Sequence, residues 1–407
     1  MARDTRDTTT DGLAADDLQL LPARSLMKIA LVSPYDWSVP GGVNSHCAHL
    51  HDQFKKAGHD VRIAAPASRR IEDPDVITIG RRPLSLPVSG SLARISLSLT
   101  LAPAVRKILA EESFDVVHVH EPFMPVLPIH FLRYSEAVNV GTFHATREKS
   151  YFFYNWGKRH LKRWFRRLDG KIAVSNAASG FVEEYFPGYY NIIPNGVDID
   201  RFSADAKPLK QFQDGKLNIL FVGRPEKRKG LDYLLKAYPQ VKAALPESRL
   251  IIVGAGKFGR YERMARSRKL TDVEFCGFVS DEELPRYYQA ADVFCAPATG
   301  FESQGIVLLE AMAAGLPIVA SNIEGYAAVF THDVEGALVL PADVDRLAEG
   351  LINVLSSSAK RKKMSAQARR RAQAYAWPRV SQQVLSYYER LLHERLIAGG
   401  ERPAQVS

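Results

Sequence analysis

A chain of 407 residues is too long for one ordinary hydrophobic core, and its composition, 46% hydrophobic and 24% charged, is globular rather than disordered, collagenous or coiled-coil. Its three cysteines show no CxxC spacing, which argues against a disulfide framework and against structural zinc. The net charge of +9 is concentrated in two patches, +7 over residues 147–171 and +8 over residues 360–379, so the rest of the chain is mildly acidic.

The first residues of the chain are predicted to be a disordered tail, residues 1–26, because five aspartates interrupt the apolar core that a secretory signal needs. A membrane-spanning helix is not expected either, since the longest apolar stretch, residues 305–320, carries Glu310 in its middle. We expect a cytoplasmic protein, attached peripherally to the inner face of the cell membrane if the basic patch described below binds lipid.

Short β-branched runs then alternate with helical patterns, which is typical of doubly wound α/β domains with parallel sheets. The expected strands are 28–33, 61–65, 115–120, 139–144, 171–175 and 191–194, then 217–223, 249–254, 273–277, 292–297, 317–321 and 337–340. They predict two facing Rossmann-like domains with a cleft between them, residues 27–199 and 217–378, joined by a linker at 200–216. A last helical pattern at 379–398 is predicted to pack back across the junction, before a second tail at 399–407.

Ligands of open α/β sheets bind beyond the carboxyl ends of the strands, so the loops after the expected strands are informative. Gly41 and Gly42 follow the first strand and open a helix, where backbone amides and the helix dipole attract an anion. A loop that merely turns is the alternative. No GxxxxGK[ST] motif occurs, which excludes a P-loop NTPase. A GxGxxG at 254–259 follows the wrong strand for dinucleotide binding and is interpreted as a tight turn.

Two cations and two acids follow strands of the second domain. Arg224 and Lys229 come after Gly223, and paired cations at such a turn neutralise a diphosphate leaving group when a sugar–phosphate bond breaks. Glu302 is expected in the loop before a helix that begins near Ile306, just after Gly305, and Glu310 is expected within that helix. Helix capping would explain either acid alone, but the combination with two cations indicates a site.

Three segments, in this order along the chain, resemble retaining glycosyltransferases of family 4, which have the GT-B fold. They are SPYDWSVPGGVNSH, VGRPEKRKG, and the pair Glu302 and Glu310 with EAMAAGLPIVAS. The segments HVHEP, TFHATREKS and FCAPATGFESQGIVLLEAMAAG are most similar to the actinobacterial phosphatidylinositol α-mannosyltransferases within that family. The resemblance implies transfer of a hexose to a phosphatidylinositol-like lipid, and its best match is mannose from GDP-mannose. The nucleotide sugar is a substrate, and no cofactor or metal is implied.

The resemblance also assigns roles to individual residues. Arg224 and Lys229 would stabilise the diphosphate, Glu302 and His144 would lie at the transferred sugar, and these four form the expected catalytic set. The expected donor-binding residues are Gly41, Gly42, Gly223, Gly305, Ile306 and Glu310, with Glu310 on the ribose hydroxyls, and the expected acceptor contacts are Tyr35, Arg94 and Lys149. His118 and His120 are interpreted as buried histidines, since metal ligation would need a third protein ligand. Three residues depart from the pattern of the family: Phe123 and Ala145, where polar side chains are expected, and Gln304, which replaces an aromatic residue.

The first basic patch fits an amphipathic helix. Lys158, Arg159, Lys162, Arg163, Arg166 and Arg167 fall on one half of its surface, and Leu161, Trp164, Phe165 and Leu168 on the other. Such a helix is typical of a segment on an anionic membrane surface. The alternative, equally consistent with the pattern, is a surface helix whose apolar stripe packs into its own domain.

Other functions stay open at this point. A family 4 enzyme that uses UDP-glucose with a soluble or different lipid acceptor would keep the same motifs. A sugar- or membrane-binding protein without catalysis is a further alternative, against which the presence of both Arg224 and Lys229 argues. No nucleic-acid signature accompanies the basic patches, so nucleic acid is the lowest-ranked partner.

Overall fold

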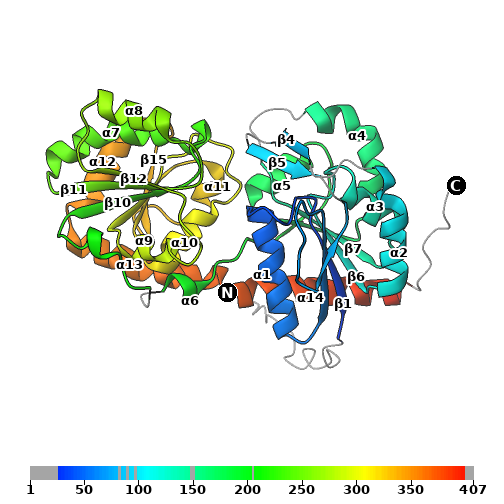
Figure 1. Ribbon diagram of the computed structural model, residues 1–407. Helices are drawn as coiled ribbons and strands as arrows, with labels where there is room; N and C mark the ends of the chain where they lie inside the picture. The colour runs from blue at the N-terminus through cyan, green and yellow to red at the C-terminus, as the bar shows by residue number, and fades with distance from the viewer. Residues whose placement is uncertain are drawn as a thin grey trace, which may run out of the picture.

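The computed structural model describes residues 26–398, apart from 81–83, 89–90, 96–98, 147–151 and 204–205. It contains two parallel sheets, one of seven strands and one of six, each flanked by helices (Figure 1). The predicted α/β class with two facing domains is therefore confirmed. Lys149, the tail predicted at 399–407 and residues 1–25 of the tail predicted at 1–26 lie outside the described residues.

The first sheet has the strand order β3-β2-β1-β6-β7-β8-β9. Its strands are β1 (Lys28–Val32), β2 (Asp60–Ala65), β3 (Val76–Thr78), β6 (Val116–His120), β7 (Val138–Phe143), β8 (Gly170–Ala173) and β9 (Asn191–Ile192). Its helices are α1 (Gly42–Lys56), α2 (Ala102–Glu112), α3 (Leu127–Tyr134), α4 (Phe152–Phe165) and α5 (Asn176–Glu183). Strand β3 and the hairpin of β4 (Leu84–Val88) and β5 (Ser91–Ile95) were not predicted.

The second sheet has the order β12-β11-β10-β13-β14-β15. Its strands are β10 (Leu217–Val222), β11 (Ser248–Val253), β12 (Val273–Gly277), β13 (Val293–Ala296), β14 (Ile318–Ser321) and β15 (Gly336–Val339). The helices are α7 (Leu231–Ala244), α8 (Gly259–Ser267), α9 (Leu284–Gln289), α10 (Ile306–Ala314), α11 (Glu324–Ala327), α12 (Val344–Leu355) and α13 (Ser358–Ala372). Every residue of β11, β13 and β14 is buried, as expected of parallel strands covered on both faces.

The last helix, α14 (Trp377–Ile397), leaves the second domain and runs along the first, as predicted (Figure 1). Its apolar side chains, including Val380 and Tyr388, complete a core with Ile29 and Phe54 of the first domain. The first domain therefore takes part of its core from the opposite end of the chain.

The segment between the two sheets contains α6 (Ile199–Phe202) and the 3-10 turn η3 (Lys210–Phe212). Phe202 and Phe212 are buried in a core of the second domain, against Tyr288 and its neighbours. The exact limits of the domains and linker stay a prediction.

Candidate active site

The predicted donor-binding residues of the two domains meet at the cleft. A Cβ atom on Gly42, at the first turn of α1, would lie 3.8 Å from Cδ1 of Ile306, at the first turn of α10. Gly42, Ile306 and Glu310 line one pocket, together with His46 and Asn195. The N-termini of two helices from different domains therefore border the same space, and helix N-termini attract anions.

The turn after β10 brings a predicted cation to a predicted acid. Gly230 ends this turn at φ 73°, and a Cβ there would lie 1.8 Å from the carbonyl oxygen of Pro297, so only glycine allows the approach to the loop after β13. As a result, Lys229 Nζ lies 2.7 Å from Glu302 Oε1. Gly223 packs against the same lysine, since its Cβ would lie 3.8 Å from Lys229 Cδ.

A third cation, Arg228, was missed by the sequence analysis. Its guanidinium pairs with Glu302 and also with Glu226, at 2.9 Å. Arg224 is on the same turn, with its side chain 54% exposed and 3.4 Å from Glu226. The turn thus carries four cations: Arg228 and Lys229 hold Glu302, whereas Arg224 and Lys227 are exposed to solvent.

The two remaining donor-site predictions lie at α10. Gly305 precedes the helix with φ 78°, and a Cβ there would lie 2.4 Å from Tyr326, so the position requires glycine. Glu310 accepts a hydrogen bond of 2.7 Å from the hydroxyl of Tyr288. Burial raises the pKa of Glu310, and this carboxylate faces the pocket that contains Gly42.

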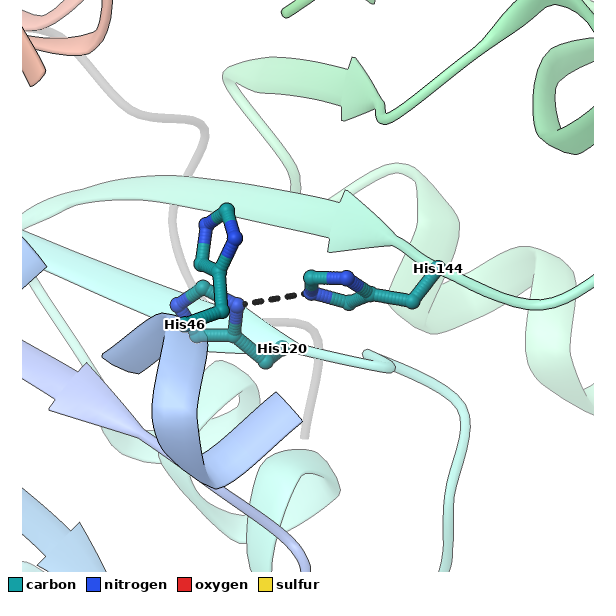
Figure 2. Close-up of side chains that lie close together, drawn as sticks. All are labelled: His46, His120 and His144. Atoms are coloured by element: carbon teal, nitrogen blue, oxygen red, sulfur yellow. Dashed lines mark hydrogen bonds between the residues drawn. The ribbon is translucent and has the colours of Figure 1, made fainter. Parts of the chain in front are cut away.

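His144 belongs to a cluster of three imidazoles on the first domain (Figure 2). His120, at the end of β6, and His144, after β7, share a hydrogen bond of 3.0 Å between Nδ1 and Nε2. His46 of α1 packs edge-on against both rings, and its ring centroid lies 4.9 Å from that of His144 and 5.3 Å from that of His120. Burial lowers the pKa of His46 to about 4 and those of His120 and His144 well below the usual range, so all three are neutral at pH 7.

These three side chains could hold a metal, because each offers a ligand atom and the atoms lie within 4.8 Å of one another. From the sequence, His118 and His120 were interpreted as buried histidines, since metal ligation would need a third protein ligand. The rings of His118 and His120 lie next to each other, with centroids 4.3 Å apart, but their other partners differ. His118 bonds to Thr142 at 2.6 Å and to Tyr388 at 2.5 Å, whereas His120 contacts His46 and bonds to His144. The signal for His46 was its position one helical turn after Gly42, on the same face of α1.

The acceptor side is only partly described. Tyr35 forms an isolated bridge with Ile95, and the amide of Asp36 donates to the carbonyl of Arg94 at 2.9 Å, so Tyr35 and Arg94 lie side by side. After β6, Glu121 accepts hydrogen bonds from the amides of His144 and Ala145, at 2.8 and 2.9 Å. This buried carboxylate fixes the loop that carries His144.

The basic helix has its apolar stripe inside the domain. Leu161, Trp164 and Leu168 are buried in the core of the first domain, which confirms the packing alternative for these residues. The basic side remains outside: Arg159, Lys162, Arg163 and Arg166 are exposed and Lys158 is half-buried, whereas Arg167 donates to the carbonyls of Leu132 and Ser135. Among the described helices, none combines the length and apolar content needed to cross a membrane.

Comparison with known proteins is consistent with this geometry. Residues 40–201 match Glycosyltransferase Family 4, and residues 203–371 match the family Glycosyl transferases group 1. The chain is 37% identical over 364 residues to a phosphatidyl-myo-inositol mannosyltransferase of Mycolicibacterium smegmatis, covering 89% of this chain and 94% of that one. The protein of the same name from Mycobacterium tuberculosis is 36% identical, with 94% and 100% covered. The sucrose-phosphate synthase of Thermosynechococcus elongatus superimposes with a TM-score of 0.74 at 21% identity, over 90% of this chain and 100% of that one, which shows the GT-B fold.

Proposed function

Because the chain belongs to glycosyltransferase family 4, we propose that it is a retaining mannosyltransferase, which transfers mannose from GDP-mannose to a phosphatidylinositol-like lipid. The names of its relatives support mannose as the transferred sugar and a phosphatidylinositol lipid as the acceptor. The observation that carries the reaction class is the contact of Lys229 with Glu302 beside the two helix N-termini at the cleft. The contact supports this reaction class, because a diphosphate sugar bound between the domains would need positive charge for its diphosphate and a carboxylate for its sugar hydroxyls.

In the proposed reaction, the acceptor hydroxyl attacks the anomeric carbon as the bond from that carbon to the diphosphate oxygen breaks. The proton of the hydroxyl passes to the departing phosphate on the same face, which retains the configuration. Arg224 and Lys229 stabilise the leaving diphosphate, and the amides at Gly42 and Ile306 add to that stabilisation. Closure of the cleft around the donor excludes water that would hydrolyse it.

The ion pairs support a role for Glu302 in binding rather than as a nucleophile. Both Arg228 and Lys229 contact this carboxylate, so its charge is already neutralised. When the diphosphate draws Lys229 away, Arg228 still holds Oε1 of Glu302, and the second carboxylate oxygen, which neither ion pair uses, can accept a hydrogen bond from a sugar hydroxyl. Glu310 is positioned for the ribose, and the neutral His144 for a hydroxyl of the transferred sugar.

We also propose that transfer requires no metal ion, because Arg224 and Lys229 supply the positive charge that a metal would otherwise bring to the diphosphate. The imidazole cluster makes this worth testing directly, since His46, His120 and His144 could hold an ion.

Access to a lipid acceptor is proposed through the exposed basic side of α4. Arg159, Lys162, Arg163 and Arg166 would bind an anionic membrane surface, while the buried apolar stripe anchors the helix to the protein. Tyr35 and Arg94 would then meet the phosphoinositol head group at the same end of the first domain.

The test is a matrix of donors and acceptors. GDP-mannose and UDP-glucose are each incubated with phosphatidylinositol vesicles, with phosphatidylcholine vesicles, or without lipid, in the presence and absence of EDTA. We expect nucleotide release only from GDP-mannose with phosphatidylinositol, equal with and without EDTA, and an α-linked product by NMR. Release of UDP from UDP-glucose, with no release of GDP from GDP-mannose, would overturn the donor assignment. Donor binding without nucleotide release would indicate a binding protein.

A matched pair of variants connects the activity to the site. Lys229→Ala should lower the rate of transfer about 100-fold or more, as expected when one charge stabiliser of a developing anion is lost. Lys227→Ala removes an exposed lysine from the same turn and should leave the rate within about twofold, as surface substitutions usually do. Equal rates in both variants would contradict the role of Lys229.

A further inference from the structure

Gln304 connects the donor-side loop to the first domain. It lies two residues after Glu302, in the loop between β13 and α10, and is 3% exposed. Its Oε1 accepts two hydrogen bonds from Asn195, one from the backbone amide at 2.8 Å and one from Nδ2 at 2.7 Å. Asn195 follows β9, so these buried bonds join the two sheets of the molecule. An aromatic residue at position 304, as in the resembled pattern, could accept neither bond.

The two bonds fix the orientation of the Asn195 amide. Because Nδ2 donates to Gln304, the Oδ1 atom is the one that faces His46 Nδ1, at 2.9 Å. A carbonyl oxygen only accepts, so His46 must carry its proton on Nδ1. A neutral imidazole has one N–H, and His46 Nε2 is therefore left as an acceptor.

This tautomer matters because His46 contacts the other two imidazoles. Its ring lies edge-on to His144 and to His120, and His120 in turn bonds to His144 (Figure 2). The orientation of His46 therefore limits which rotations and proton positions the other rings can adopt. A rotated His46 would present its N–H or its lone pair to a different neighbour.

We propose that Gln304 is a positioning residue which, through Asn195, fixes the tautomer and orientation of His46 and thereby aligns His144 with the sugar. This series of side-chain contacts runs from the loop of Glu302 in the donor domain to the imidazoles of the acceptor domain. Its catalytic consequence rests on the proposed function, but the state of His46 can be measured without any substrate.

The first experiment measures by NMR which ring nitrogen of each imidazole carries the proton. The protein is labelled with 15N-histidine, and the signals of His46 are assigned with a His46→Gln variant. The parent should show His46 protonated on Nδ1 with a bare Nε2. Gln304→Leu, which fills similar space without an acceptor, should shift His46 to a mixture of tautomers, and Gln304→Glu, whose carboxylate accepts both bonds, should restore the parent pattern. An unchanged His46 spectrum in Gln304→Leu would overturn the proposal.

The second experiment separates positioning from stability. In Gln304→Leu we expect kcat to fall about 10-fold or more, with KM for GDP-mannose within about threefold, and Gln304→Glu to recover most of the loss. The matched control is Asn218→Leu, which removes another buried amide that donates to Phe212 and Ala290 at the amino end of β10. It should lower stability without changing kcat or the His46 spectrum.

The outcomes keep the two proposals apart. Parent protein without transferase activity would defeat the proposed function, while the NMR comparison would still decide the state of His46. Normal kcat in Gln304→Leu, or the same loss of kcat in Asn218→Leu, would show that Gln304 has only a structural role and would overturn the inference.

Discussion

Glu121 is the buried acid whose titration has the clearest consequence for stability. Its side chain lies at the end of β6, 5% exposed, and burial raises its pKa from 4.5 to about 7. Between these two values the folded protein holds a proton that the unfolded chain releases. The contribution of Glu121 to stability is therefore full below pH 4.5 and is lost as the pH rises through 7.

We predict that Glu121→Gln reduces the pH dependence of folding. The glutamine oxygen can still accept from the amides of His144 and Ala145, but it does not titrate. The free energy of unfolding, measured with urea, should fall between pH 5 and pH 8 by about 2 kcal/mol more in the parent than in the variant. The buried imidazoles, whose pKa values are lowered, act in the opposite direction in both proteins and cancel in the difference. Identical pH dependence would mean that Glu121 is already ionised in the folded state.

At the scale of residues, the sequence could predict those that lie directly after strands. Lys229 and Glu302 follow β10 and β13, which are neighbours in the sheet, so their contact follows from topology. Arg228 could not be separated from Lys227 within one basic run, because the 3-10 turn decides which side chain points to Glu302. The Gln304 bonds depend on how two domains meet, and no local pattern in the sequence encodes that.

At the scale of elements, long apolar runs were predicted and short irregular ones were missed. All twelve expected strands are present. Most of them are largely buried, and strands buried on both faces are continuous apolar runs, although β9 and β12 have no buried residue. Strand β3 has three residues and β4 contains Pro87, which normally argues against a strand. The hairpin is a two-stranded antiparallel sheet of its own, so Pro87 interrupts no ladder of the main sheet.

The basic helix yields a prediction at this scale. If its exposed side binds anionic lipid, Lys162→Gln with Arg163→Gln and Arg166→Gln should weaken binding to vesicles of phosphatidylserine and phosphatidylcholine about 100-fold, at about 1 kcal/mol for each charge. Stability should change little, because the buried stripe of Leu161 and Trp164 is untouched. Vesicle sedimentation at several salt concentrations measures the effect.

The second basic patch provides the control with equal loss of charge. Lys362, Lys363 and Arg370 are exposed on α13, in the second domain. Their replacement by glutamine should leave vesicle binding within about threefold if binding is local to α4, since screening limits the reach of surface charges to about 10 Å. Equal weakening in both triple variants would show that net charge alone attracts the lipid and that α4 has no special role.

At the scale of the whole molecule, the last helix makes the two domains interdependent. Seven side chains of α14, from Trp377 to Leu391, are buried in a core that otherwise consists of first-domain residues. Tyr388 also donates to or accepts from His118 at 2.5 Å, and the hydroxyl of Tyr387 accepts from the amide of Lys171 at 3.0 Å. The helical pattern was visible in the sequence, but the surface that it covers follows from the direction in which the chain leaves the second domain.

Removal of this helix should therefore unfold the first domain selectively. Seven buried side chains at about 1.5–3 kcal/mol each amount to as much as a typical domain has in total stability. In a chain that ends at Ala376, we predict that hydrogen exchange becomes fast in β1, β6 and β7 and stays slow in β10, β11 and β13. The control is Arg390→Ala with Glu394→Ala, an exposed ion pair of 3.6 Å on α14, which should leave both domains protected because such pairs contribute little. Slow exchange in β1 and β6 of the shortened chain would show that the first domain is stable without α14, and that the helix serves only to tether the two halves at the cleft.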